Sequence, residues 1–223
     1  MIVLIAKRVA AEKAVELIDN GMVVGLGSGS TSTLAIRKIA EYVKNGLQIT
    51  AVASSKNSEK LAKELGIPII PFSEVKEIDI TIDGADEVDH DMNLIKGGGG
   101  ALLREKILAF NSKKFVVIID ESKLVNKLGQ FPLPVEIVPF ASELTLKHLE
   151  ALNCKPLIRR HNDKEWISDN GNLIVDCIFN VINDPSDLNQ KIRSIPGVVE
   201  TGLFIGMTHT LIIGNMEGTT RTL

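Results

Sequence analysis

The amino-acid sequence predicts an α/β protein with a Rossmann-like, mostly parallel sheet, helices on both faces of that sheet, and a smaller α+β domain of the ferredoxin-like kind. Two patterns lead to this fold class. In the first half of the chain, short uninterrupted apolar runs alternate with segments of helical periodicity, which is typical of parallel strands buried on both faces. After residue 131 the expected order changes to β-α-β-β-α-β, the split βαβ arrangement.

The first half begins with an amphipathic helix. Residues 6–19 place apolar side chains at helical spacing, and Asn20-Gly21 supplies a stop signal. Runs such as residues 115–119 are all apolar and of strand length, which indicates buried strands. We expect helices at residues 6–19, 33–43 and 58–65, and strands at residues 22–26, 49–53, 67–70, 78–82 and 115–119.

The pattern changes around Phe131-Pro132-Leu133-Pro134. Beyond it we expect strands at residues 135–138, 155–160, 173–180 and 198–203, and helices at residues 142–152 and 186–194. The apolar run 209–214 reads as a last strand that could rejoin the first sheet. These elements predict a Rossmann-like domain at residues 1–130 and 204–223 and a ferredoxin-like domain at residues 131–203, with one continuous α/β domain as the alternative.

Composition narrows the class of function. The chain has 223 residues, 44% of them hydrophobic and 24% charged, as in ordinary globular proteins. A net charge of −3, from 25 basic and 28 acidic residues, argues against a general nucleic-acid binder. It still allows an anionic small molecule, because a local cluster of lysines and amides can outweigh a mildly negative whole. Cys154 and Cys177 lack CxxC spacing, so buried thiols are expected rather than a disulfide scaffold or a zinc site. The apolar start of the chain is too short to span a membrane, and we expect a cytoplasmic protein.

A run of four glycines is the most informative stretch. Gly97 to Gly100 stand between Lys96 and a helix-like segment that contains Glu105 and Lys106. Consecutive glycines destabilise regular structure, but they expose backbone N–H groups and let a small anion come close. A carboxylate, ammonium groups and amides gathered in this way suit chemistry in which a base removes a proton and donors hold the oxyanion. A flexible surface loop before an ordinary helix is the plainer alternative.

Two more polar segments follow expected strands. The first, Gly27-Ser28-Gly29-Ser30-Thr31-Ser32, precedes a helix and suits an anion such as phosphate. It matches neither GxxxxGK[ST] nor GxGxxG, because Ser30 stands where the third glycine belongs. The second, Asp83-Gly84-Ala85-Asp86-Glu87, places two carboxylates on one strand-end turn. A helix cap with a glycine turn explains the first equally well, and an Asx turn explains the second.

A metal site is not expected. A calcium loop that begins at Asp89 would place Asp91 and Asn93 correctly, but Leu94 occupies the position that requires glycine. The four histidines are scattered and lack metal-binding or triad-like neighbours, so we expect them to be structural or exposed.

Taken in order, the three polar segments resemble those of type A ribose-5-phosphate isomerases. The resemblance extends over nearly the whole chain and includes Asp120-Glu121-Ser122-Lys123, Phe131-Pro132-Leu133-Pro134-Val135-Glu136, Asp169-Asn170-Gly171-Asn172 and residues 195–204. It implies interconversion of ribose 5-phosphate and ribulose 5-phosphate in the pentose phosphate pathway, without a metal or organic cofactor, by a homodimer or homotetramer. Together with the composition, it leads us to expect a small-molecule sugar phosphate as ligand and no nucleic-acid or membrane partner.

The resemblance also implies roles for particular residues. Glu105 would be the catalytic base, and Lys96, Asp83 and Asp86 would complete the catalytic set. The substrate-binding residues would be Ser28, Gly29, Ser30, Thr31, Asp83, Gly84, Ala85, Asp86, Lys96, Gly97, Gly98, Gly99 and Lys123.

The chemistry assigns tasks to these groups. We hypothesise that Glu105 carries the proton between C2 and C1 through an enediolate, and that Lys96 and the glycine amides stabilise its oxygen. One of Asp83 and Asp86 would assist ring opening, and which one is left open. Ser30 and Thr31 would hold the phosphate, aided by Lys123 or Lys7, although Lys7 is more simply explained as part of a solvated helix face. A non-catalytic sugar-phosphate sensor, a sugar-phosphate deaminase and an acyl-CoA transferase are the rival interpretations.

Overall fold

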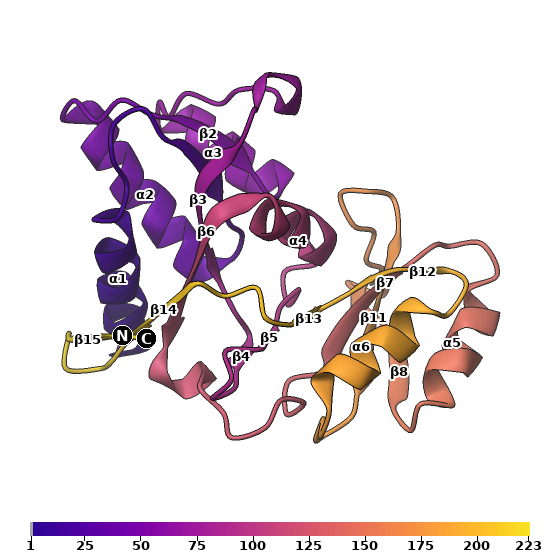
Figure 1. Cartoon of the computed structure of the whole chain (residues 1–223). Helices are drawn as coiled ribbons and strands as arrows, with labels where there is room; N and C mark the ends of the chain where they lie inside the picture. The colour runs from indigo at the N-terminus through magenta and orange to yellow at the C-terminus, as the bar shows by residue number, and fades with distance from the viewer. Residues whose placement is uncertain (1) are drawn as a thin grey trace. The chain divides into compact units, whose positions relative to one another are not determined.

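The computed structural model describes residues 2–223 (Figure 1). The chain forms two compact units. The first consists of the residues up to Ala85 together with Arg104–Leu124 and Met207–Leu223. The second consists of Asp86–Leu103 and Val125–Gly206. Among the described residues, none of the helices combines the length and the hydropathy that a bilayer-spanning segment needs.

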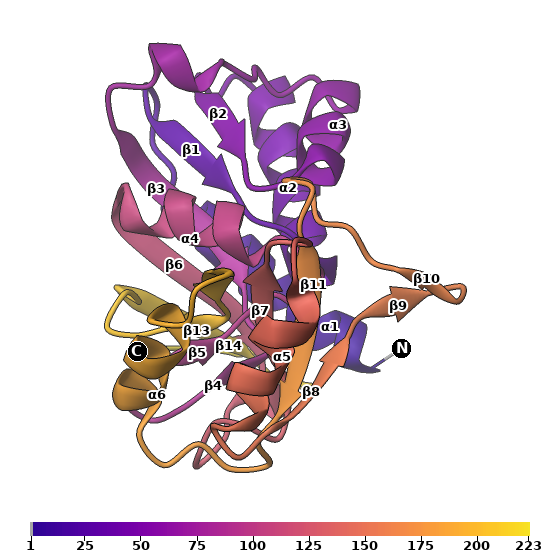
Figure 2. The ribbon, with the colours of Figure 1, turned by 90° about the vertical axis from the view of Figure 1, so that its right-hand side faces the viewer.

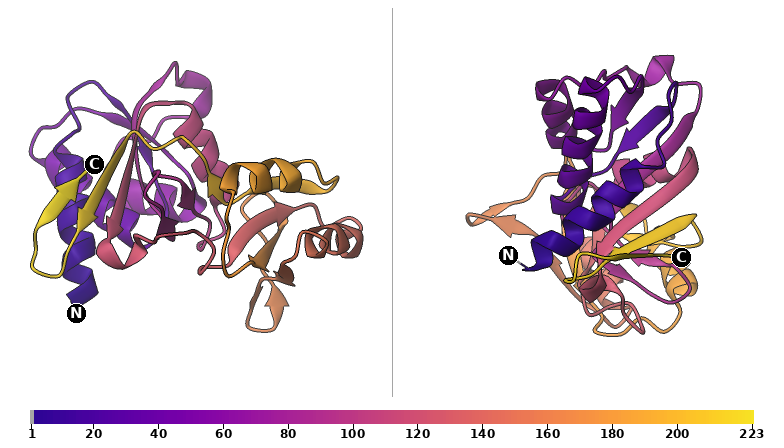
Figure 3. Two further views of the ribbon diagram at one scale, coloured as in Figure 1. Left: turned by 60° about the horizontal axis from the view of Figure 1, so that its bottom comes forward. Right: turned by 90° about the vertical axis from the view of Figure 1, so that its left-hand side faces the viewer.

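A six-stranded sheet forms the centre of the first unit. Its order is β15-β14-β6-β3-β1-β2, and every neighbouring pair is parallel except β14 and β15. The strands are β1 (Val23–Leu26), β2 (Thr50–Ala53), β3 (Ile78–Gly84), β6 (Ser112–Asp120), β14 (Thr210–Gly214) and β15 (Thr220–Thr222). The expected last strand therefore does rejoin the first sheet, beside β6, and the left view of Figure 3 shows β15 following it.

Helices cover both faces of this sheet. They are α1 (Ile2–Val15), α2 (Ser30–Lys44), α3 (Lys56–Glu64) and α4 (Leu102–Phe110), of which α4 starts in the second unit. Figures 1 and 2 place α1 and α2 on one side of the strands and α4 on the other. The main core forms where Ala10 and Ala14 of α1 and Ile36 of α2 meet Ile80 and Ile82 of β3. This burial of apolar side chains on helices and strands is the main force that holds the unit together.

The second unit contains a four-stranded antiparallel sheet in the order β12-β7-β11-β8. Its elements are β7 (Leu133–Ile137), α5 (Ser142–Glu150), β8 (Lys155–Ile158), β11 (Leu173–Ile178), α6 (Pro185–Arg193) and β12 (Val198–Thr201). Their order is the βαββαβ arrangement that the sequence predicts. Val175 and Cys177 of β11 lie in the core with Leu149 of α5 and Ile192 of α6, so Asp176 between them faces the other side of the sheet.

Several short elements escape sequence patterns. The strands β13 (Leu203–Phe204), β5 (Leu94–Ile95) and β4 (Glu87–Val88) form a small sheet in the second unit. The strands β9 (Arg160–His161) and β10 (Lys164–Glu165) form a hairpin that projects from β8 and β11 (Figure 2). Single turns of 3₁₀ helix, η1 (Phe72–Glu74) and η2 (Glu121–Lys123), complete the structure. A strand of two residues is too short for an alternating pattern to reveal it.

Some predicted boundaries are wrong. The expected strand at residues 67–70 is only an isolated bridge between Ile69 and Ala51, because Pro68 has no N–H to continue a ladder. The first helix occupies Ile2–Val15 rather than residues 6–19, and α2 begins at Ser30 rather than at residue 33. The compact units also divide the chain elsewhere than at residues 131 and 203, since the glycine run and β5 belong with the second unit. Both cysteines are buried and free.

Candidate active site

In the first unit, the loop after β1 is hydrogen-bonded to the end of β3. Asp83 is fully buried, and its Oδ1 accepts hydrogen bonds from the Ser28 amide (2.9 Å) and from the Ser32 hydroxyl (2.8 Å). The amide of Gly84 donates to the same oxygen at 2.8 Å. A Cβ at Gly27 would lie 2.1 Å from Asp83 Oδ1, so only glycine permits this approach. Two of the predicted site segments therefore share one edge of the sheet, as the carboxyl ends of neighbouring parallel strands do.

The N-terminus of α2 forms the other part of this loop. The helix begins at Ser30, after Gly29 in a left-handed conformation (φ 93°). Thr31 is buried and Ser30 is exposed. The ammonium group of Lys7 donates to Ser30 Oγ at 3.1 Å. A helix N-terminus, hydroxyl groups and a lysine are the groups that bind phosphate. Lys7 contacts the loop through Ser30, whereas the sequence favours a solvated helix face for it.

Serines beyond the predicted site support the loop. The hydroxyl of Ser28 lies 2.8 Å from those of Ser54 and Ser55, both buried, which follow β2. Ser58 donates to the carbonyl of Gly27 at 2.7 Å. This cluster is absent from the predicted site because serines near a helix start are expected as caps, which is also the role of Ser55 in α3.

Two more candidate residues belong to the first unit. Glu105 lies in the first turn of α4 and is only 4% exposed. The helix macrodipole favours a negative charge at that end of a helix. Lys123 ends η2, which follows β6, the strand beside β3. Lys123 therefore also follows the carboxyl end of a strand of the parallel sheet.

In the second unit, Lys96 is buried beside β13. Its residue is 2% exposed, and its backbone amide donates to the carbonyl of Gly202 at 2.9 Å. Its ammonium nitrogen lies 5.5 Å from the centre of the Phe204 ring, a cation–π distance. Lysine is rarely buried to this extent unless its ammonium group has an interaction partner. The buried cation thus has a fixed backbone and an aromatic neighbour.

The glycine run forms a tight turn in which Gly100 N–H donates to the Gly97 carbonyl at 2.9 Å. Both end residues have positive φ, 103° at Gly97 and 77° at Gly100. A Cβ at Gly98 would lie 2.6 Å from Asp86 Oδ1, and a Cβ at Gly100 would lie 2.5 Å from Trp166 Nε1. Gly99 differs, because it is exposed, has no positive φ, and has open space within 4 Å of the point where a Cβ would stand. Nothing in this unit requires glycine at position 99.

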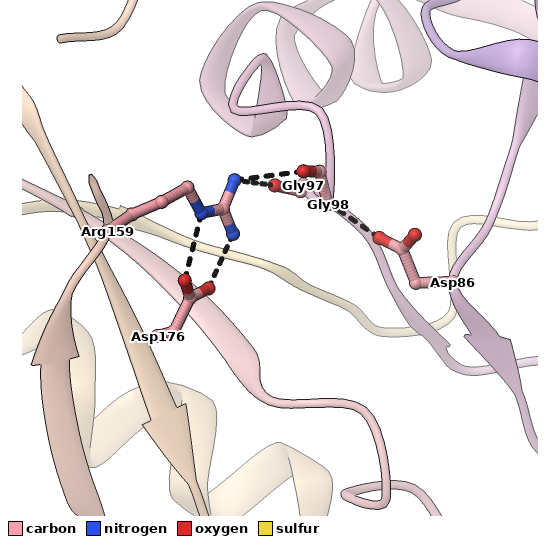
Figure 4. A network of polar contacts seen from close by, with 5 residues as sticks. All are labelled: Asp86, Gly97, Gly98, Arg159 and Asp176. Atoms are coloured by element: carbon pink, nitrogen blue, oxygen red, sulfur yellow. Dashed lines mark hydrogen bonds and ion pairs between the residues drawn. The ribbon is translucent and has the colours of Figure 1, made fainter. Parts of the chain in front are cut away.

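Figure 4 shows how this turn is held. Asp86 Oδ2 accepts the Gly98 N–H at 2.8 Å. On the other side, Arg159 Nη1 donates to the carbonyls of Gly97 (2.9 Å) and Gly98 (3.0 Å). The same guanidinium forms a two-pronged ion pair with Asp176, with bonds of 2.9 Å from Nε and 2.5 Å from Nη2. Arg159 and Asp176 are absent from the predicted site, and an acidic residue inside the apolar run of β11 is the one signal that could have drawn attention to them.

Proteins of known family are similar to this sequence over most of its length. Residues 50–218 match the family described as ribose 5-phosphate isomerase A (phosphoriboisomerase A). The chain belongs to the ribose-5-phosphate isomerase A family. One relative, ribose-5-phosphate isomerase A of Bacillus mycoides, is 51% identical over 213 residues, which cover 95% of this chain and 96% of the relative. Another, from Picrophilus torridus, is 49% identical over 212 residues, covering 95% and 94%.

Solved structures agree with this family in fold. Ribose 5-phosphate isomerase from Plasmodium falciparum has a TM-score of 0.95 at 39% identity and covers 100% of this chain and 98% of its own. A D-ribose-5-phosphate isomerase in complex with phospho-erythronic acid has a TM-score of 0.93 at 40% identity, covering 97% and 96%. The predicted fold class, a Rossmann-like sheet plus a smaller ferredoxin-like domain, is confirmed.

Proposed function

We propose that this protein interconverts D-ribose 5-phosphate and D-ribulose 5-phosphate through an enediolate. Membership of the ribose-5-phosphate isomerase A family supports this activity, as does the name of the relatives. The observation that carries it in this chain is that Lys96 and Glu105, which flank the glycine run in the sequence, are both buried ionisable residues. An aldose–ketose isomerisation needs one base that moves a proton and one set of donors that holds an oxyanion.

Glu105 is the proposed base. A carboxylate above two adjacent carbons can take the proton from C2 and return it to C1, because the enediolate between the two steps is planar. Lys96 and the amide of Gly99 are the proposed donors to the enediolate oxygen. The Gly98 amide already donates to Asp86. Of the other two amides, Gly97 is buried and Gly99 is exposed, which favours Gly99 as the donor.

The proposed ring-opening residue is Asp83 or Asp86, because the aldose is largely cyclic in water. Asp83→Asn keeps an acceptor oxygen for Ser28 and Ser32 but cannot take up a proton. If Asp83 assists ring opening, we expect net conversion of ribose 5-phosphate to fall by about 10²-fold or more. Exchange of the C1 hydrogen of ribulose 5-phosphate with deuterated water, followed by NMR, should fall much less, because that step needs no ring.

Equal losses in net conversion and in exchange would contradict a ring-opening role for Asp83. Asp79→Asn is the matched control, since Asp79 lies at the other end of β3 and holds β1 through the Val23 amide. Asp79→Asn shows how far net conversion and exchange fall when a carboxylate of β3 is changed outside the proposed site.

The phosphate group is proposed to bind at the start of α2. Thr31→Val removes a hydroxyl and keeps the shape of the side chain. We expect KM for ribose 5-phosphate to rise, by roughly 10-fold for one hydrogen bond to a charged group, while kcat changes little. Thr33→Val, further along α2, should leave KM unchanged. Steady-state kinetics check both variants, and inhibition by inorganic phosphate should weaken in Thr31→Val alone.

A coupled assay for ribulose 5-phosphate tests the function itself. Formation of the ketose from ribose 5-phosphate, with and without EDTA, separates the isomerase from the rival classes. A non-catalytic sensor would bind the sugar phosphate without turnover, and a deaminase or an acyl-CoA transferase would be inactive on it. The absence of ketose in both assays would overturn the proposal.

We also propose that the protein works in the cytoplasm in the pentose phosphate pathway, as a homodimer or homotetramer. Exposed phenylalanines at 110 and 140 support self-association, because an interface would remove them from water. Light scattering of the purified chain measures the subunit number, and a monomer at assay concentration would contradict this part.

A further inference from the structure

The carbonyls of the glycine turn are held by a cation that the proposed chemistry does not use. Arg159 donates through one nitrogen, Nη1, to two consecutive carbonyls, those of Gly97 and Gly98. The remaining prongs of its guanidinium engage both oxygens of Asp176. The side chains are 14% and 24% exposed. A two-pronged arginine–carboxylate pair fixes the orientation of the guanidinium plane.

Because Arg159 fixes the carbonyls of Gly97 and Gly98, it also fixes the direction of the N–H groups in the same peptides. A trans peptide group is planar, so its N–H points away from its own C=O. The peptide that joins Gly97 to Gly98 obeys this rule visibly, because its C=O meets Arg159 while its N–H donates to Asp86 on the opposite side (Figure 4). The next peptide also turns its C=O to Arg159. Its N–H, which belongs to Gly99, must therefore point to the side away from the arginine.

The Gly99 amide is the exposed one of the two amides, those of Gly97 and Gly99, that remain available. Among the described residues it has no hydrogen-bond acceptor, and Gly99 is exposed. Neither the backbone φ nor the packing within the second unit requires glycine at position 99. A backbone that a ligand must approach closely is the remaining reason for glycine. A charged donor on the Gly98 carbonyl also polarises that peptide and makes its N–H a stronger donor.

We propose that Arg159, oriented by Asp176, is a positioning residue for the isomerisation. It holds two carbonyls of the glycine turn so that the Gly99 N–H faces the developing enediolate oxygen. The inference rests on the proposed function and adds to it Arg159, directly after β8, and Asp176 of β11, whose effect is transmitted through the backbone. Arg159 itself does not contact the substrate.

The test compares Arg159→Gln with Arg160→Gln, an exposed arginine at the next position. We expect Arg159→Gln to lower kcat for ribose 5-phosphate by about 10- to 100-fold, the cost of misplaced groups, with KM nearly unchanged. Affinity for phospho-erythronic acid, whose carboxylate carries charge where the enediolate would, should fall with kcat. Affinity for inorganic phosphate should not. Arg160→Gln should resemble the wild type in all four measurements.

The double variant Arg159→Gln/Asp176→Asn separates positioning from stability. Arg159→Gln alone leaves the Asp176 carboxylate without its partner and should lower Tm. Removing that charge in the double variant should raise Tm again, whereas kcat should stay low. If kcat recovers together with Tm, or if a folded Arg159→Gln keeps the wild-type kcat, the positioning role is refuted. Should Arg159→Gln fail to fold, the double variant alone decides by its kcat. An inactive wild type would instead refute the proposed function.

Discussion

Replacing Glu105 with glutamine is expected to lower kcat for ribose 5-phosphate by about 10²- to 10⁴-fold, the usual contribution of a general acid–base group. Glutamine preserves the shape of a side chain that is 4% exposed in the first turn of α4, so the fold should survive. An amide cannot accept the C2 proton, so the chemical step should slow while the substrate still binds. KM should therefore change far less than kcat.

Isotope transfer makes the test of Glu105 specific. In the wild type, tritium at C2 of the aldose should appear at C1 of the ketose or in water, and in Glu105→Gln both labelled products should form more slowly by the same factor as kcat. Glu143→Gln is the matched control, because Glu143 is also a first-turn glutamate, on the exposed side of α5. Near-normal turnover by a folded Glu105→Gln protein would remove Glu105 from the role of base.

The fold was readable from the sequence wherever an element was long and its pattern regular. Residues 115–119 are wholly apolar and lie inside β6, and residues 142–152 show helical spacing and include α5. Boundaries failed where backbone chemistry decided instead of hydropathy. Pro68 reduces an apolar run to one bridge, and β4, β5 and β13 are too short to show any period.

The candidate site also contains residues that the sequence predicts and residues that it does not. Ser28 and Asp83 are both at carboxyl ends of strands, and the rule for parallel sheets is sufficient to bring them to one edge; in the structure they are hydrogen-bonded. Arg159 follows no such rule. It reaches the backbone carbonyls of glycines 61 and 62 residues away in sequence, and carbonyls carry no side-chain signature. Contacts of this kind become visible only when the fold is known.

Replacing Lys96 with methionine is expected to lower kcat by about 10²- to 10³-fold, the typical cost of losing one donor to a developing oxyanion. Methionine retains the length and apolar stem of a side chain that is 2% exposed and packs on Phe204, so the second unit should keep its structure. The charge matters most when the enediolate forms, and the loss should therefore appear in kcat and in the affinity for phospho-erythronic acid more than in KM. Lys147→Met, an exposed lysine of α5, serves as the control for removing a positive charge from the same unit. A rise in KM at constant kcat would make Lys96 a ground-state binding residue, and stabilisation of the enediolate would then rest on the backbone amide of Gly99.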